Sequence, residues 1–117
     1  MKIFPKNEPR KFTLKSVVIS HVADVELDPD EMITFRTSKG SEYDVAAKDW
    51  GFYATPSLNH RLSQFNLRPA LIRSRENGRR YVVIVEQGKE EEFNRYITQQ
   101  KLEILGMLDV EHLDIKD

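Results

Sequence analysis

Leu67-Arg-Pro-Ala-Leu-Ile-Arg-Ser-Arg-Glu-Asn-Gly-Arg-Arg-Tyr-Val-Val-Ile-Val-Glu86 is the stretch that decides the fold. Two runs of strand-forming residues flank Asn77-Gly78, and Asn-Gly in this position is a strong indication of a β-hairpin with a two-residue turn. We therefore predict antiparallel strands over residues 67–74 and 80–86.

The expected register gathers arginines on one face of this hairpin. A two-residue turn pairs Arg75 with Arg80 and puts Arg73 on the same side. The run Tyr81–Val85 is apolar on both of its alternating faces, which predicts a central strand covered on two sides. Its partner contains Pro69, which favours an edge strand or the start of a strand.

Helices are predicted on both sides of the hairpin. Thr55 as N-cap and Pro56 as the first helical residue predict a short helix over 56–65. A second helix, over 89–100, begins with three glutamates, which the positive end of the helix dipole stabilises. A last strand is expected over 102–108.

Towards the N-terminus the pattern is that of strands. β-branched residues dominate 11–22, which predicts one strand with a bulge near Val17. Residues 27–31 contain Asp-Pro-Asp and predict a turn. Before residue 11, two prolines and few apolar residues predict a loose arm.

Two further strands, over 32–37 and 42–47, are expected to form a hairpin. A three-residue connection puts Phe35 on the same face as Tyr43, whereas a two-residue loop would mix the faces, so we predict the longer loop. From Glu42 onward the order is then β-α-β-β-α-β, the split pattern of ferredoxin-like domains, after two extra N-terminal strands.

The expected fold class is therefore α+β, mostly antiparallel sheet with two short helices, with the ferredoxin-like arrangement as its finer form. Residues 1–10 are expected to be a flexible arm, 11–108 a single α+β domain, and 109–117 an acidic tail. With 117 residues, 39% of them hydrophobic and 32% charged, such a chain can bury a core of its own.

Several classes of protein are excluded by composition. The chain has no cysteine, which rules out disulfides, thiolate metal sites, iron–sulfur clusters and a cysteine nucleophile. No apolar run is long enough for a signal-peptide core or a membrane span. We expect a cytoplasmic protein with no membrane contact, and no motif indicates a metal or another cofactor.

Charge is spread unevenly along the chain. The net charge is −1, but residues 51–81 carry six arginines and one glutamate, whereas residues 82–117 carry four basic and nine acidic residues. The middle of the chain is thus basic and the last third acidic, a split that favours association between copies.

The stretch Lys48–Arg61 holds the single Trp and is the first candidate for a binding site. Either Trp50, Phe52 and Tyr53 wall a ligand pocket at the start of the first helix, or Trp50 and Phe52 plug the end of the sheet as core residues. The stretch is also expected to act as a hinge between an N-terminal β-layer and the remainder. With the arginines of the hairpin, the predicted ligand-binding residues are Trp50, Tyr53, Thr55, Ser57, His60, Arg61, Arg73, Arg75 and Arg80.

Each chemical interpretation has a plainer alternative. The arginines form either an anion site or a solvated face neutralised by Glu86, Glu90 or Glu103. Tyr81 after Gly-Arg-Arg is only faintly similar to an RNA-binding strand, and a net charge of −1 disfavours nucleic acid. The three histidines are scattered without metal-ligand spacing, and His60 has no catalytic motif around it.

Two segments, Asp49–Asn59 and Tyr81–Phe93, resemble those of small uncharacterised bacterial proteins associated with surface-polysaccharide gene neighbourhoods, including those of acidic sugars. The resemblance spans about residues 42–108. It implies a sugar or sugar nucleotide as ligand, and it implies no catalytic residue.

Together these observations lead to one expected function and two alternatives. The first is a small non-catalytic accessory or binding domain that self-associates as a dimer, has an anion-accepting surface and is linked to surface-sugar metabolism. The alternatives are a nucleic-acid-binding domain and an enzyme acting on an anionic sugar or nucleotide.

Overall fold

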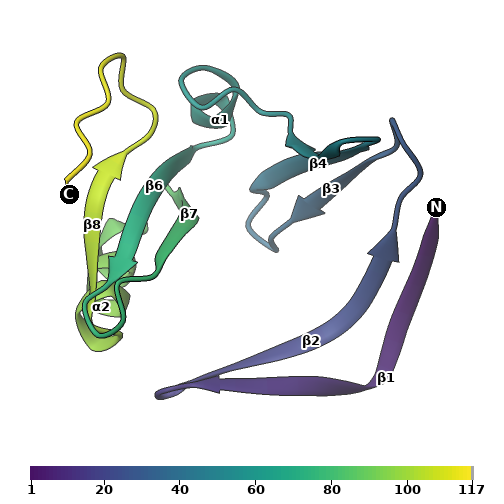
Figure 1. Ribbon diagram of the computed structural model, residues 1–117, viewed down its shortest axis with the longest axis horizontal. Coiled ribbons are helices and arrows are strands. Elements are labelled where there is room, and N and C mark those ends of the chain that lie inside the picture. Colours follow the sequence, from purple (N-terminus) through teal and green to yellow (C-terminus); the bar gives the residue numbers. More distant parts are fainter. Residues whose placement is uncertain (117) are drawn as a thin grey trace. The chain divides into compact units, whose positions relative to one another are not determined.

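The computed structural model describes residues 1–116, which form mostly antiparallel sheets with two helices (Figure 1). This is the small α+β fold that the sequence predicts. The chain divides into two compact units, residues 1–34 with 44–55, and residues 35–43 with 56 onward.

In the first unit, β1 (Lys2–Leu14) and β2 (Val17–Glu26) form a two-stranded antiparallel sheet. The predicted single strand over 11–22 is wrong, because the chain reverses at Lys15-Ser16 and pairs Leu14 with Val17. Lys15 adopts φ 55°, the left-handed conformation that a tight turn of this kind uses. Most of the first ten residues, expected to be a loose arm, belong to β1, because strand pairing uses backbone groups and needs few apolar side chains.

A three-stranded sheet is made of β3 (Met32–Arg36), β4 (Glu42–Lys48) and β5 (Gly51–Ala54), with β4 in the middle; the hairpin end of β3 and β4, residues 35–43, is assigned to the second unit. The predicted turn before it is confirmed by a bond from Glu31 N to Asp28 O of 3.1 Å. The predicted three-residue connection is also confirmed, because Thr37 N donates to Ser41 O at 3.1 Å.

β5 is absent from the prediction. It pairs with β4 from Lys48 opposite Gly51, so the chain turns at Asp49-Trp50, and Gly51 takes φ 145°, a value that favours glycine. One of the three boundaries between the units falls a few residues later, between Thr55 and Pro56, inside the stretch that is expected to be a hinge.

In the second unit, β6 (Leu67–Ser74), β7 (Arg80–Glu86) and β8 (Leu102–Met107) form an antiparallel sheet in the order β7-β6-β8. The bounds predicted for β6 and β7 are confirmed, but the register is shifted by two residues. Ser74 N donates to Arg79 O at 2.8 Å, so four residues form the loop, and Arg73 lies opposite Arg80. A shift of two leaves every side chain on its predicted face, because side chains alternate with a period of two.

The position of β7 in the sheet differs from the prediction. The apolar run of β7 was expected to be central, but β7 is an edge strand and β6, with Pro69, is the middle one. Pro69 fits there because its carbonyl oxygen accepts from Leu108 N, one residue beyond β8. The ferredoxin-like arrangement is not confirmed, since β4 belongs to another sheet than β7.

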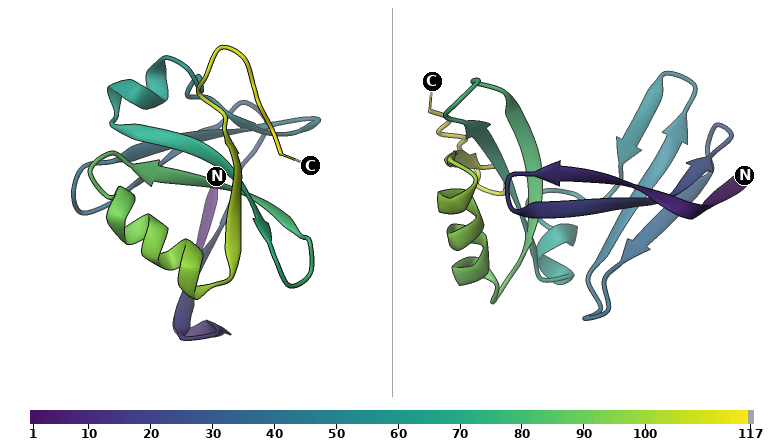
Figure 2. Two further views of the ribbon diagram at one scale, coloured as in Figure 1. Left: turned by 90° about the vertical axis from the view of Figure 1, so that its left-hand side faces the viewer. Right: turned by 90° about the horizontal axis from the view of Figure 1, so that it is seen from below.

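The two helices of this unit are α1 (Arg61–Gln64) and α2 (Glu90–Gln99). α2 agrees with its prediction and packs against β7 and β8, on one face of the sheet (Figure 2). The predicted start of α1 at Thr55-Pro56 is wrong. Pro56 is buried instead, and the Ser57 hydroxyl accepts the bond from Arg61 N at 2.8 Å that opens the helix.

The core of the second unit is formed by residues of α1, β6 and β8, and the C-terminal segment closes over β8. The buried apolar residues here are Leu62, Leu67, Ala70, Ile72 and Leu105. Residues 109–116, expected to be an acidic tail, fold back so that Lys116 N donates to Leu105 O at 3.0 Å. This bond engages the outer side of β8.

Candidate binding site

The predicted ligand-binding residues are divided between the two units. Trp50, Tyr53 and Thr55 belong to the first unit, and the other six belong to the second. Trp50 and Phe52 are exposed, Phe52 to 78%, so the alternative that they plug the core is wrong. They are exposed because Asp49-Trp50 is the tip of a β-hairpin, a position that sequence spacing did not indicate.

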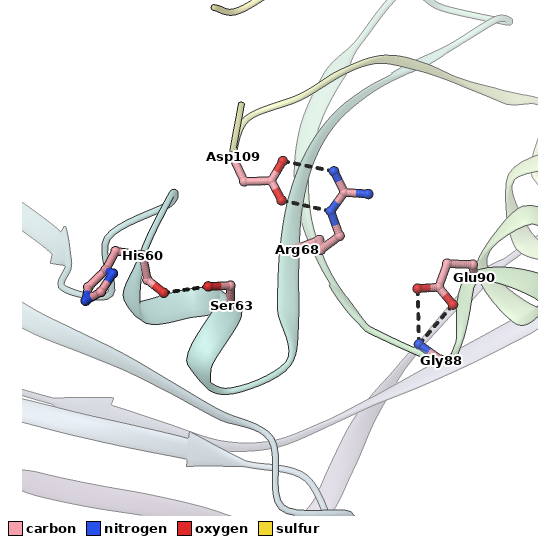
Figure 3. Close-up of polar contacts among 6 residues, drawn as sticks. All are labelled: His60, Ser63, Arg68, Gly88, Glu90 and Asp109. Atoms are coloured by element: carbon pink, nitrogen blue, oxygen red, sulfur yellow. Dashed lines mark hydrogen bonds and ion pairs between the residues drawn. The ribbon is translucent and has the colours of Figure 1, made fainter. Parts of the chain in front are cut away.

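The residues around the start of α1 hold the local backbone. The Ser63 hydroxyl donates to His60 O at 2.7 Å (Figure 3). The His60 ring lies 3.4 Å from the Gln64 side-chain amide. Ser57 bonds the backbone N–H of Arg61. The hydroxyls of Ser57 and Ser63 therefore bond the backbone around the four-residue helix, and the His60 ring lies beside the Gln64 side chain.

The hairpin arginines are largely neutralised by one carboxylate. Glu103 of β8 lies opposite Arg73 of β6, and its carboxylate contacts Arg73 Nη2 at 2.6 Å and Arg75 Nη1 at 3.4 Å. The hydrogen bond from Arg73 lowers the pKa of Glu103 below its ordinary value of 4.5. Arg80, in contrast, takes part in no ion pair within residues 1–116.

Two further polar contacts fix the other end of this sheet. Arg68 of β6 forms an ion pair with Asp109, and this bond lowers the pKa of Asp109 (Figure 3). After β7 the chain turns at Gly88, with φ 91°, whose N–H donates to both carboxylate oxygens of Glu90. The start of α2 is thereby held beside the end of β7.

A hollow of about 640 Å³ lies along the outer edge of β7. It is lined by the consecutive residues Val83, Ile84, Val85 and Glu86, whose side chains alternate between the two faces of the sheet. A hollow that touches both faces at once must lie at the strand's edge. Its two walls are the tip of the β3–β4 hairpin, at residues 37–39, and the residues of α2 and its N-cap, which are Lys89, Glu92, Phe93 and Tyr96.

Charged groups surround one end of this hollow. The Thr37 hydroxyl donates to the Glu86 carboxylate at 2.9 Å, a bond that lowers the pKa of Glu86. A side-chain hydrogen bond with Lys89, together with the like charge of the Lys89 ammonium group, lowers the pKa of Lys39. The hollow thus has an apolar middle and a rim that carries both signs of charge.

The backbone of β7 offers hydrogen-bonding groups towards the same side. In an antiparallel ladder, hydrogen-bonded and non-hydrogen-bonded residue pairs alternate. The backbone hydrogen bonds of Ser74 with Arg79 and of Gln87 with Asn66 show which residues between them belong to each kind of pair. By that alternation the N–H and C=O groups of Val82 and Ile84 point away from β6. Unpaired groups of this kind at an open edge are a template for another strand.

The residues of this hollow were not among the predicted site residues. Lys39 and Phe93 are far from each other in the sequence, and Tyr81–Val85 was expected to be covered on both sides. The available indication was the pair of charges, Arg80 and Glu86, that brackets this apolar run. Charges at both ends of a strand are typical of an exposed edge.

Within residues 1–116 no group of three or more His, Asp or Glu side chains is arranged to hold a metal ion. In the same part of the chain, neither helix has the length and apolar character needed to span a bilayer. Comparison with protein-family models, curated proteins and solved structures found no match for this chain.

Proposed function

We propose that this protein is a non-catalytic binding domain that accepts an extended strand of a partner protein along β7. One observation carries the proposal, namely the hollow beside an edge strand with outward N–H and C=O groups. Backbone bonds supply affinity in this mode of recognition, and the pockets for alternate side chains supply selectivity.

The lining of the hollow supports an extended peptide over a small anion. Its middle is formed by Val83, Val85 and Phe93, which favour apolar side chains. An anion-accepting surface built from Arg73, Arg75 and Arg80 has weaker support, because the first two share Glu103. A bound anion would have to compete with that carboxylate.

The test uses a fluorescein-labelled heptapeptide of alternating valine and threonine, N-methylated at every second amide so that it cannot pair with itself. We expect saturable binding by fluorescence anisotropy, with loss of binding in Val82→Pro. Proline at position 82 removes an N–H that points outward and leaves the ladder to β6 intact. A matched control, Val22→Pro, changes an exposed valine of β2 and should bind as the original chain does. Equal binding to Val82→Pro would refute the proposal.

A further inference from the structure

The two halves of β7 differ in how much of them is exposed. Tyr81 and Val82 are 47% and 60% exposed, whereas Val83 to Glu86 are partly covered and line the hollow. One half of the strand is therefore an uncovered apolar segment, and the other half lies beside an unfilled space. These two halves are complementary if a second copy approaches in the antiparallel direction.

The order of charges in β7 selects one register for such a pair. Arg80 stands at the start of the strand and Glu86 at its end, with five apolar residues between them. Antiparallel pairing centred on Val83 places each Arg80 opposite Glu86 of the second copy. Because a pair of identical antiparallel strands is two-fold symmetric, this contact forms twice. Opposite charges directly across a ladder stabilise the pairing of the two strands.

The backbone allows the same register and excludes every register shifted by an odd number of residues, so the charges select among those that remain. Residues 80, 82, 84 and 86 present their N–H and C=O groups outward, and antiparallel bonds form only between residues that both point to the partner. Pairing centred on Val83 matches Val82 with Ile84 of the second copy, both of which point outward. A register shifted by one residue would match outward groups with inward ones, and it would also separate the charges.

From these features we infer that β7 pairs with β7 of a second copy and joins the two β7-β6-β8 sheets into one continuous sheet. This inference rests on the proposed function, since it names the strand that the edge accepts. Tyr81 and Val82 of each copy then enter the hollow of the other, Val82 beside Ile84 and Tyr81 beside Val85. Arg80, which has no ion-pair partner within residues 1–116, gains Glu86.

Charge reversal tests the register. Arg80→Glu puts two glutamates opposite each other at both ends, and Glu86→Arg puts two arginines there. We expect each variant alone to raise the dissociation constant of the dimer about 10- to 100-fold in sedimentation velocity. Mixed together, the two variants should form a heterodimer, because every glutamate then faces an arginine. The double variant, Arg80→Glu with Glu86→Arg, should regain the homodimer.

Arg79→Glu is the matched control, because it makes the same charge change one residue before β7 and should leave the dimer unchanged. Circular dichroism of each variant checks that it folds, since Glu86 also bonds Thr37. A chain that sediments as a monomer up to millimolar concentration would overturn the inference, and so would a dimer that survives Val82→Pro. If the chain is a monomer and yet binds the N-methylated heptapeptide, the proposed function stands and only this inference fails.

Discussion

Arg68 and Asp109, 41 positions apart, are joined by two parallel hydrogen bonds, Nε to Oδ2 at 2.8 Å and Nη2 to Oδ1 at 3.0 Å. The planar guanidinium matches both carboxylate oxygens, which an ammonium group cannot do. The pair ties the residue after Leu108 to the middle strand of the β7-β6-β8 sheet, so it anchors the segment that closes over β8.

Replacing Arg68 by lysine should therefore lower the free energy of unfolding by about 0.5–1 kcal/mol, because one of the two bonds is lost at a partly exposed site. Urea denaturation monitored by circular dichroism measures the change in the free energy of unfolding. Arg95→Lys is the control, because Arg95 contacts Glu91 only at 3.9 Å on an exposed helix face. If both substitutions had the same effect, the paired geometry of Arg68 would have no special role.

The same pair should make stability depend on pH. The hydrogen bond from Arg68 lowers the pKa of Asp109 in the folded chain below its ordinary value of 3.8. A carboxylate with a lowered pKa contributes stability that is fully present above 3.8 and is lost as the pH falls through the folded value. The difference in unfolding free energy between the original chain and Asp109→Asn should thus be constant from pH 5 to 7 and shrink below pH 4. A difference that grew on acidification would contradict this.

Gly106→Ala should displace the C-terminal segment. A Cβ at this position would lie 2.9 Å from Asp114 O and 2.9 Å from Ile115 Cδ1, and the first of these is backbone. We expect the free energy of unfolding to fall by about 1–3 kcal/mol, the usual effect of overpacking. Alternatively, residues 110–116 detach from β8 and become sensitive to proteolysis. In a chain truncated after Asp109 the same substitution should cost little, because the clashing atoms are gone. An equal cost in both chains would point to another cause.

Leu62 and Leu58 provide a matched pair. On the helix that the sequence predicts over residues 56–65, Leu58, Leu62 and Phe65 would recur at i, i+4 and i+7 and form one apolar stripe. Leu62 is 0% exposed and Leu58 is 42% exposed. Leu62→Ala should destabilise the protein by about 2–5 kcal/mol through the cavity it leaves, and Leu58→Ala by less than about 1 kcal/mol. Thermal unfolding of the two variants at one pH measures the difference. If the two substitutions destabilised the protein equally, Leu58 and Leu62 would both be core residues, as the predicted stripe requires.

Glu103→Gln should uncover a basic surface. The substitution removes the carboxylate that Arg73 and Arg75 share, while a neutral side chain of the same size remains. Retention on heparin should increase and should fall with added salt, as phosphate-type contacts do. Glu91→Gln, which makes the same charge change on α2, is expected to increase retention less. Without any increase for Glu103→Gln, the two arginines would have to be neutralised by other groups.

Local patterns determined many of the elements. Strand-forming runs around Asn77-Gly78 predict the bounds of β6 and β7, and the three glutamates that begin α2 predict where it starts, because turns, caps and propensities act within a few residues. The three-residue loop before Ser41 follows from the need to keep Phe35 and Tyr43 on one face. A solvated arginine face neutralised by Glu103 was also among the alternatives that the sequence offered.

Tertiary structure alone decided which strand lies at an edge and which residues meet at β7. The apolar run of β7 favours a central strand by composition, yet β7 lies at an edge, because the order β7-β6-β8 depends on which strands pair on the two sides of β6, a contact between distant segments. Lys39 and Phe93 enter the same hollow for that reason, although nothing in their local sequence connects them. Local chemistry determined many of the elements of this protein, and long-range pairing decided which strand of the β7-β6-β8 sheet lies at the edge.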